Sequence, residues 1–402
     1  MRKNTKKMVL ILATLFTILF ATSASAQSDR ITGLRQTNST QKAIDIAWDA
    51  LPYGNVYYYL ETSLDGVNWE YAGNAYEDNE FSVYEFKPAT TVYIRVTAEE
   101  DEQVVAESDV LTATTAPAKV EGLRQTGATT SGITIDWNAS EGATGYQIKS
   151  FANGRTQYIG ETTSTSYTIN NMDELLNGWQ YIYVVPVRNI GNYTAQYDSF
   201  ASFRGDYVYL ESDEIKLVPK AIKSIKISAY NNDTKNIGFT FDGPQYSTGY
   251  EYGLYTYNNK KVKSGVWRGS SSNGFTKLKN TFYIIKIRPY TYVNGKKLCG
   301  SWFQGSFAFQ PKVKFKQLNG KVKASWNKVS GAKKYVVYMS DKKGSGHKKI
   351  KTTKKRTIKI SKFKKKGLKK GKSYYVYVSA VRNIGGHTYT SYAKYCYRFV
   401  AN

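Results

Sequence analysis

The chain has 402 residues, a formal net charge of +26 and only two cysteines, Cys299 and Cys396. Two cysteines far apart in the chain exclude a disulfide scaffold and a cysteine-based metal site. The length is sufficient for about two to four domains of ordinary size.

Residues 1–26 have the pattern of a secretory signal peptide. Basic residues among positions 2–7 precede an apolar run, and Ala24 and Ala26 form the small-x-small site that a signal peptidase needs. The run is too short to span a bilayer comfortably, so we disfavour the alternative of a membrane-anchored start. We expect a secreted protein that begins near Gln27, with no transmembrane segment and no C-terminal wall-sorting signal.

The rest of the chain contains internal repeats. The pentapeptide Gly-Leu-Arg-Gln-Thr occurs at residues 33–37 and 122–126, and Val-Arg-Asn-Ile-Gly occurs at 187–191 and 381–385. The offsets of 89 and 194 residues indicate a period the size of one whole domain.

Each period has the same strand pattern. A turn and then a strand opened by Tyr57, Tyr146, Tyr250 or Tyr335 follow a short alternating strand. Alternation with turn signals roughly every 8–12 residues is typical of half-buried antiparallel sandwiches, and no stretch after residue 26 keeps helical periodicity. The predicted fold class is therefore all-β. Six aromatic residues are expected in the core. Four end the alternating strands and two belong to later strands: Trp48, Trp137, Phe241 and Trp326, and Tyr181 and Tyr374.

A leucine, a glycine and a tyrosine ahead of a later strand resemble a known family. Leu368, Gly371 and Tyr374 have the spacing found around the sixth strand of a fibronectin type III domain, and Tyr181 has the same place in the second repeat. In that family the tyrosine hydroxyl ties the corner to the backbone. The third repeat is one residue short, and Val92 stands where the first repeat should carry the tyrosine. The resemblance implies four tandem fibronectin type III-like (immunoglobulin-like) sandwiches after the signal peptide.

Prolines mark the expected domain boundaries, because proline cannot donate to a β-ladder. The predicted domains are the signal peptide (1–26), an acidic first repeat (27–116), a second repeat with a long loop (117–218), a basic third repeat (219–310) and a strongly basic fourth repeat (311–402).

The net charge changes sign along the chain. It is −11 for residues 28–116, −4 for 117–218, +11 for 219–310 and +26 for 311–402, where 27 basic residues stand against one acidic residue. A solvated surface that keeps strand edges apart is the simpler interpretation. So large an excess favours contact with a polyanion. The candidate contacts are Lys348, Lys349, Lys354, Lys355, Arg356, Lys364, Lys365, Lys366, Lys369 and Lys370.

Arg204, Gly205 and Asp206 form the one short recognition motif. They fall in an insertion of about a dozen residues before the last strand of the second repeat, and long loops in compact domains are often functional. The integrin-binding domain of fibronectin carries the same tripeptide in the corresponding loop. A chance match within a lengthened hairpin is the alternative. The motif is a candidate receptor loop.

No catalytic constellation is evident. His347 and His387 are the only histidines, and we expect both to be solvated loop residues. The acidic run at residues 99–102 is interpreted as a turn. We therefore expect no enzyme activity, no catalytic residues, no cofactor and no metal site.

These observations favour a secreted, non-catalytic adhesion or interaction protein. The signal peptide and lysine loops resemble those of secreted proteins of Gram-positive bacteria. The basic C-terminal repeats would therefore bind a polyanionic cell-wall polymer. The N-terminal repeats would be exposed and would bind a protein or glycan ligand. Nucleic acid is an unlikely partner because the chain is predicted to be secreted. The alternatives are a passive spacer and a glycan-binding module whose stacking residues are Trp69, Tyr71, Trp267 and Trp302.

Overall fold

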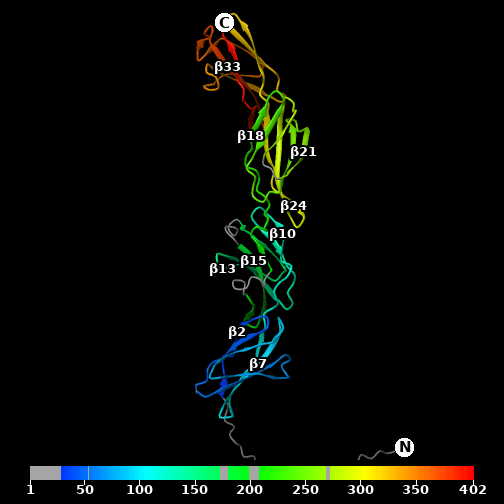
Figure 1. The fold of residues 1–402 in the computed structure, drawn as a ribbon, viewed down its shortest axis with the longest axis vertical. Coiled ribbons are helices and arrows are strands. Elements are labelled where there is room, and N and C mark those ends of the chain that lie inside the picture. Colours follow the sequence, from blue (N-terminus) through cyan, green and yellow to red (C-terminus); the bar gives the residue numbers. More distant parts are fainter. Residues whose placement is uncertain (1–28, 53, 173–179, 199–207, 269–271) are drawn as a thin grey trace, which may run out of the picture. The chain divides into compact units, whose positions relative to one another are not determined.

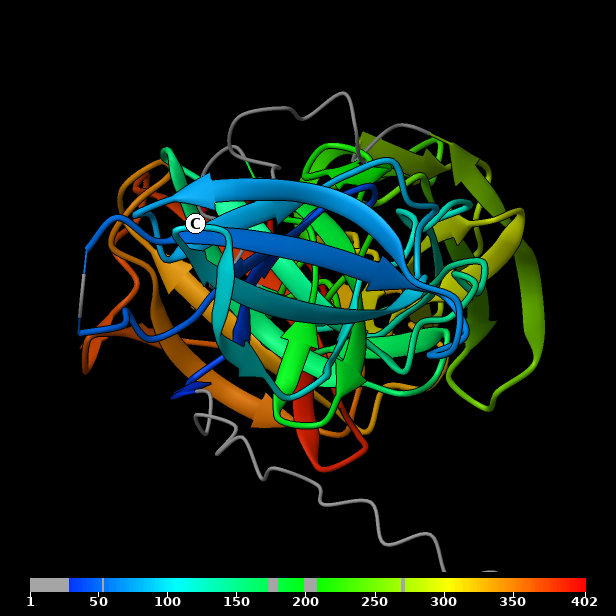
Figure 2. The ribbon, with the colours of Figure 1, turned by 90° about the horizontal axis from the view of Figure 1, so that it is seen from below.

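The structure, a computed structural model, describes residues 29–52, 54–172, 180–198, 208–268 and 272–402. Its described elements are all β-strands, and the ribbon in Figure 1, like the view from below in Figure 2, consists of arrows and connecting loops. The predicted all-β class is confirmed for these residues. The predicted signal peptide lies outside them.

Strands from residues 29–114 form the first pair of sheets. A three-stranded sheet, β2–β3–β6, faces a larger sheet in the order β1–β8–β7–β4–β5, with β9 also paired to β7. Ile44 and Ile46 of one sheet share a buried cluster with Ile94 and Val96 of the other. The bounds are β1 (Asp29–Ile31), β2 (Arg35–Ser39), β3 (Ile44–Ala47), β4 (Tyr57–Ser63), β5 (Glu70–Tyr76), β6 (Glu80–Val83), β7 (Thr91–Glu100), β8 (Gln103–Ser108) and β9 (Leu111–Thr114).

Strands from residues 124–211 form the second pair. The sheets are β10–β11–β14 and β13–β12–β15–β16, with β17 also paired to β15. The bounds are β10 (Arg124–Ala128), β11 (Ile133–Asp136), β12 (Gly145–Ala152), β13 (Arg155–Thr162), β14 (Ser166–Ile169), β15 (Gln180–Ile190), β16 (Tyr193–Ala195) and β17 (Tyr209–Glu211).

Strands from residues 226–308 form the third pair. Its sheets are β18–β19–β22 and β21–β20–β23–β24, with β25 also paired to β23. The bounds are β18 (Lys226–Asn231), β19 (Asn236–Thr240), β20 (Gly249–Thr256), β21 (Lys261–Arg268), β22 (Ser272–Phe275), β23 (Phe282–Val293), β24 (Lys296–Cys299) and β25 (Phe303–Ala308).

Strands from residues 313–400 form the fourth pair. Its sheets are β26–β27–β30 and β29–β28–β33–β34, with β35 also paired to β33, and a short hairpin, β31–β32, stands beside them. The bounds are β26 (Val313–Leu318), β27 (Lys321–Trp326), β28 (Lys334–Ser340), β29 (Lys348–Thr353), β30 (Thr357–Ile360), β31 (Lys362–Phe363), β32 (Lys366–Gly367), β33 (Ser373–Ile384), β34 (His387–Thr390) and β35 (Tyr397–Val400). We call the four pairs the first to fourth sandwiches.

The aromatic residues that end the alternating strands are buried in all four sandwiches, at 0% exposure for Trp48, 3% for Trp137, 6% for Phe241 and 5% for Trp326. Each packs against a tyrosine of the next strand at a ring-centroid distance of 4.8–5.7 Å. In the first sandwich this partner is Tyr58, the second residue of β4, which opens at Tyr57 as predicted. Because successive side chains in a strand point to opposite faces, Tyr57 lies outside and is 46% exposed.

The recurring pentapeptides stabilise the sandwiches. The glutamine of the first motif ties its strand to the C-terminal part of its sandwich: Gln36 Nε2 donates to the Thr114 carbonyl of β9 (2.8 Å), and Gln125 Nε2 donates to the carbonyl of Lys216 (2.6 Å), which follows β17. In the fourth sandwich Gln317 donates to Val400 in the same way. These side chains thereby satisfy backbone carbonyl groups of a segment far away in the sequence.

The second pentapeptide forms a hairpin turn that also holds a loop. Arg188 donates to the Gly142 carbonyl (3.0 Å), and Arg382 donates to the Gly331 carbonyl (2.7 Å). The glycine that ends the motif is left-handed in both copies, with φ of 53° at Gly191 and 56° at Gly385. The repeats therefore preserve the same local contacts.

The corner tyrosines follow the predicted pattern where their surroundings are described. The Tyr374 hydroxyl accepts a hydrogen bond from the Lys369 backbone N–H (3.2 Å), and Tyr283 accepts one from Lys279 (2.8 Å) although its repeat is one residue short. Val92 fills the position in the first sandwich and is fully buried. Tyr374 is buried as expected, at 3% exposure, but Tyr181 is only partly buried, because it packs at 5.0 Å against Tyr209 beside the core; residues 173–179 lie outside the described ones.

By compactness the chain divides into two units. One contains the described residues up to Ala118 with Glu141–Thr144 and Pro186–Tyr197, and the other contains Lys119–Ser140, Gly145–Val185 and Asp198–Asn402. The units do not coincide with the repeat boundaries, which stay predictions.

Candidate functional site

The candidate polyanion contacts are all exposed and come from three segments of the fourth sandwich. Lys348 and Lys349 open β29, and residues 354–356 form the turn between β29 and β30. The remainder surround the β31–β32 hairpin. The receptor-loop residues Arg204, Gly205 and Asp206 lie outside the described residues, so that hypothesis stays a prediction.

A row of three lysines crosses the outer face of the three-stranded sheet. Lys316 of β26 lies directly opposite Lys323 of β27, and Lys323 lies directly opposite Lys359 of β30. All three are exposed, while the neighbouring Val322 and Ala324 face the core. Directly opposite residues have Cβ atoms only about 4.5–5.5 Å apart, and like charges in this arrangement are destabilising. We call Lys316, Lys323 and Lys359 the lysine row.

The equivalent position carries no such charge in the other sandwiches. Three residues before the core aromatic, the first sandwich has Asp45, flanked by Asn38 and Ser82. The second and third have neutral rows, Gly127–Thr134–Thr168 and Ala229–Gly238–Gly274. The shared fold therefore does not require lysine there.

A basic groove adjoins the lysine row. It has a volume of about 440 Å³ and runs between β29 and β30, the edge strands of the two sheets. Lys351, Lys355, Lys359 and Lys362 line it together with threonine, serine and isoleucine, and no acidic residue is among the lining. Lys359 belongs to both the groove and the row, so the two form one continuous cationic surface. We call this hollow, with its four lining lysines, the lysine groove.

The β31–β32 hairpin presents lysines in a strained turn. Its two central residues, Lys364 and Lys365, have φ of 52° and 66°. A two-residue turn with both φ values positive normally uses Asn-Gly or another pair with glycine, because a side chain there is strained. Strain at a surface turn is a feature that recurs at functional sites.

The one acidic residue of the fourth repeat is neutralised locally. Lys372 and Lys364 donate to the Asp341 carboxylate at 2.9 and 3.2 Å. These hydrogen bonds, that from Lys372 first, lower the pKa of Asp341 to about 2. The charge of Lys364 is therefore directed to Asp341, and among the candidate contacts it is the one with an internal ion pair.

Sequence reasoning named the turn lysines but not the lysine row. Nothing in a single strand shows that Lys316 and Lys323 lie opposite each other. The signal that could have found the row is the spacing from the core aromatic. Counting back three residues from Trp326 gives Lys323, and the two neighbouring strands then supply its partners.

The aromatic residues considered for glycan stacking have different surroundings. Trp267 stacks on Tyr252 at 4.4 Å and packs against the third core. The guanidinium groups of Arg95 and Arg288 cover Trp69 and Trp302 at 4.4 and 4.6 Å. Tyr71, by contrast, is 63% exposed. Cross-strand packing therefore accounts for Trp267.

His347 differs from the expectation of a solvated loop residue. Its Nε2 lies 3.3 Å from the Cys396 Sγ, and its ring centroid lies 5.0 Å from that of Tyr377. Burial lowers the pKa of His347 and raises the pKa of Cys396, so both shifts favour the neutral forms. A thiol nucleophile needs the thiolate, and this environment does not favour it.

The described residues hold no group of three or more His, Cys, Asp or Glu side chains that could bind a metal ion. The acidic run at residues 99–102 forms the end of β7 and the turn into β8, as expected. Within the part of the chain that the structure describes, no helix is long and apolar enough to cross a membrane.

Comparison with known proteins gives only distant structural likenesses. No family model matches the chain, and no curated protein matches it. The FN1–FN3 domains of chicken CNTN1 are 13% identical, cover 69% of this chain and 98% of their own, and have a TM-score of 0.25. A two-domain fibronectin type III segment of chicken tenascin is 11% identical over 46% of this chain and 98% of its own, with a TM-score of 0.24.

The domain of human fibronectin type III domain containing protein 3 is 20% identical over 24% of this chain and 93% of its own, with a TM-score of 0.22. The all-β fold follows from the sheet order, and the buried aromatics and tyrosine corners agree with the resemblance to fibronectin type III domains.

Proposed function

We propose that the chain is a secreted, non-catalytic interaction protein whose fourth sandwich binds an anionic polymer of the cell envelope. The lysine row carries this proposal. Three exposed like charges lie directly opposite one another across three strands, an arrangement that lowers stability unless a counter-charge is present. An anionic polymer supplies that counter-charge.

The lysine groove supports the same partner. An open groove lined by four lysines suits an extended chain of anionic groups better than a compact small ligand. Its continuity with the row through Lys359 lets one polymer contact both. Lysine, a compact and strongly hydrated point charge, suits a repeated phosphate that needs no bidentate recognition.

The leader pattern at residues 1–26 points to a polymer outside the cytoplasm. With the resemblance to secreted Gram-positive proteins, this favours a phosphate-rich wall polymer such as teichoic acid over nucleic acid. The acidic first and second repeats, at −11 and −4, would be repelled by the same polymer and would remain available to a ligand. We therefore propose that they form the presented part of a cell-surface adhesion protein.

Salt elution tests the docking. The chain is bound to isolated Gram-positive cell walls and washed with rising salt. The proposal expects release well below about 1 M salt, where the screening length falls to roughly 3 Å. Retention at that concentration would contradict an electrostatic contact, and equal binding to double-stranded DNA at matched phosphate would favour a general polyanion binder.

A further inference from the structure

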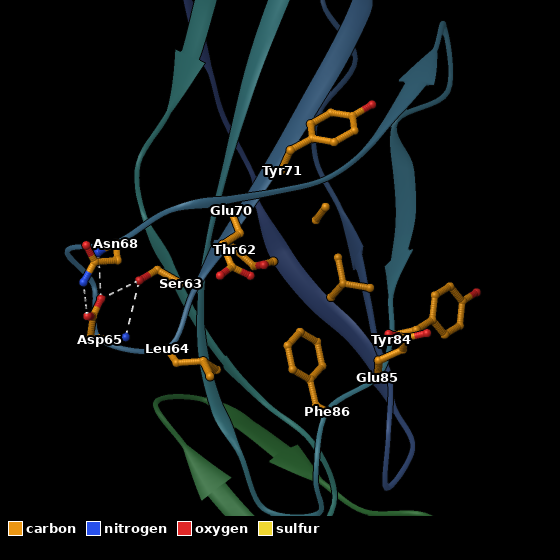
Figure 3. Close-up of a pocket in the computed structure, with 12 residues that line it drawn as sticks. Thr62, Ser63, Leu64, Asp65, Asn68, Glu70, Tyr71, Tyr84, Glu85 and Phe86 are labelled. Atoms are coloured by element: carbon orange, nitrogen blue, oxygen red, sulfur yellow. Dashed lines mark hydrogen bonds between the residues drawn. The ribbon is translucent and has the colours of Figure 1, made fainter.

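The first sandwich has an open groove of about 720 Å³ that the proposed docking does not use. It lies beside the turn after β4, the start of β5 and the end of β6, and Figure 3 shows its lining side chains. Leu64, Tyr71 and Tyr84 at its rim are 66%, 63% and 65% exposed. Exposed aromatic and apolar side chains gathered around one hollow are a typical mark of an interaction surface. We call this hollow the tyrosine groove.

The tyrosine groove is anionic. Asp65, Glu70 and Glu85 are among its lining, and no lysine, arginine or histidine is. Figure 3 shows Glu70 between Tyr71 on one side and Leu64 with Phe86 on the other. Backbone N–H groups of Asn68 and Val67 donate to the Asp65 carboxylate at 2.8 Å and hold the pKa of Asp65 well below its usual value. The groove thus keeps negative charge beside exposed aromatic rings.

This combination suits a lysine-rich segment. An ammonium group is attracted both to a carboxylate and to the face of a tyrosine ring, and the aliphatic stem of lysine packs on apolar surface. A neutral sugar is less well matched, because it carries no cationic group to pair with the three carboxylates of the lining.

The chain itself contains the complementary segment. The turn between β29 and β30 exposes Lys354, Lys355 and Arg356 on a repeat of net charge +26, whereas the repeat that holds the tyrosine groove has −11. We infer that the tyrosine groove binds the β29–β30 turn of a second copy of this chain. Because the two surfaces differ, the contact is heterologous, and repeated use of it joins copies head to tail.

This association does not depend on the proposed polymer docking, but the two share the fourth sandwich. An anionic polymer bound at the lysine groove competes with the tyrosine groove for Lys355, which lines the former and belongs to the turn. Soluble polyanion should therefore dissociate the head-to-tail chains. Copies would join one another in solution and separate when the polymer is bound.

Complementation between two variants tests the inference. Chains from residue 27 onward carry either Glu70→Gln with Glu85→Gln, or Lys354→Gln, Lys355→Gln and Arg356→Gln. Sedimentation velocity over rising protein concentration is expected to show association of the wild type at about 50 mM salt that is lost at about 500 mM, because the contact is screened. Each variant alone should associate at least tenfold more weakly. Their mixture should form one-to-one dimers and nothing longer, since only one intact contact remains.

Matched controls separate this result from a general charge effect. The Asp101→Asn, Glu102→Gln variant removes the same charge from the exposed β7–β8 turn and should associate like the wild type. The tyrosine-groove variant, Glu70→Gln with Glu85→Gln, should bind cell walls normally, so loss of association and failure of polymer docking are distinguishable. The inference would be overturned if the wild type is monomeric or if the tyrosine-groove variant associates as strongly as the wild type. It would also be overturned if the sedimentation changes do not depend on protein concentration, or if the mixture of the two variants stays monomeric. Glycan binding abolished by Tyr71→Ala in a monomeric protein would assign the groove to sugars instead.

Discussion

The first and fourth sandwiches use the same position of the same sheet in opposite ways. In the first, Asp45 accepts hydrogen bonds from Ser82 at 2.6 Å and Asn38 at 2.8 Å, so its row is satisfied internally. In the fourth, the equivalent row is Lys316, Lys323 and Lys359, which can only repel one another. The fold is therefore a common support on which the outward side chains vary. The row of like charges in the fourth sandwich is the basis for the anionic partner proposed above.

Removing the lysine row should give the largest effect. Lys316→Gln, Lys323→Gln and Lys359→Gln together are expected to weaken binding to a teichoic acid-rich wall about 100-fold at low salt, because each lysine near an anionic surface contributes about 1 kcal/mol. Equilibrium binding to isolated walls measures this. Lys260→Gln, Lys261→Gln and Lys263→Gln in the third repeat remove the same charge and should change affinity far less. Equal losses in both variants would show that only net charge matters.

The stability of the two rows should respond with opposite signs. Asp45→Ala removes the acceptor for two side chains and is expected to lower the free energy of unfolding of the first sandwich by about 1–2 kcal/mol. The triple glutamine variant relieves repulsion and should raise that of the fourth sandwich by about 0.5–1 kcal/mol at low salt. Amide hydrogen exchange along β3 and β27 distinguishes the two. A destabilised fourth sandwich would argue that the lysine row serves folding.

Relieving the strain in the β31–β32 turn should raise stability and weaken wall binding, both by smaller amounts. Lys364→Asn with Lys365→Gly should raise stability by about 1 kcal/mol, because these residues accept positive φ more readily. Wall binding should weaken by severalfold through the lost Lys365 charge. Chemical unfolding and wall binding of the same variant measure both quantities. A loss of stability would show that the lysines are better suited to the turn than glycine.

The smallest effect is expected from the pH response of Asp341. Its pKa of about 2 is below the ordinary 3.8, so its contribution to stability is present above about 3.8 and is lost as the pH falls through 2. An NMR titration of this carboxyl should give a midpoint near 2. Lys372→Gln should move the midpoint toward 3.8, since Lys372 is the first cause of the shift. A wild-type midpoint near 3.8 would mean that the ion pair does not persist in solution.

The sequence predicts much of the fold because its main signals are local. Trp48, Trp137, Phe241 and Trp326 end alternating strands, and their burial follows from period-two alternation. The strand start at Tyr57 was predicted correctly, but adjacent tyrosines leave the buried one undecided until the strand pairs with its neighbour.

The remaining site features depend on contacts between distant segments. Lys316 and Lys359 are joined only through the register of β27, and His347 meets Cys396 across 49 residues of sequence. The tyrosine groove likewise brings together residues of three strands and their turns. No pattern in one segment specifies such pairings. The change of net charge along the chain, by contrast, follows from counting the basic and acidic residues of each repeat.

Wall binding before and after removal of the phosphate polymer tests the central claim most directly. The wild type and the lysine-row variant are compared on intact Gram-positive walls and on walls stripped of teichoic acid. The proposed function predicts that the wild type binds intact walls far more strongly than the variant, and that both bind stripped walls equally weakly. Undiminished binding of the wild type to stripped walls would contradict it.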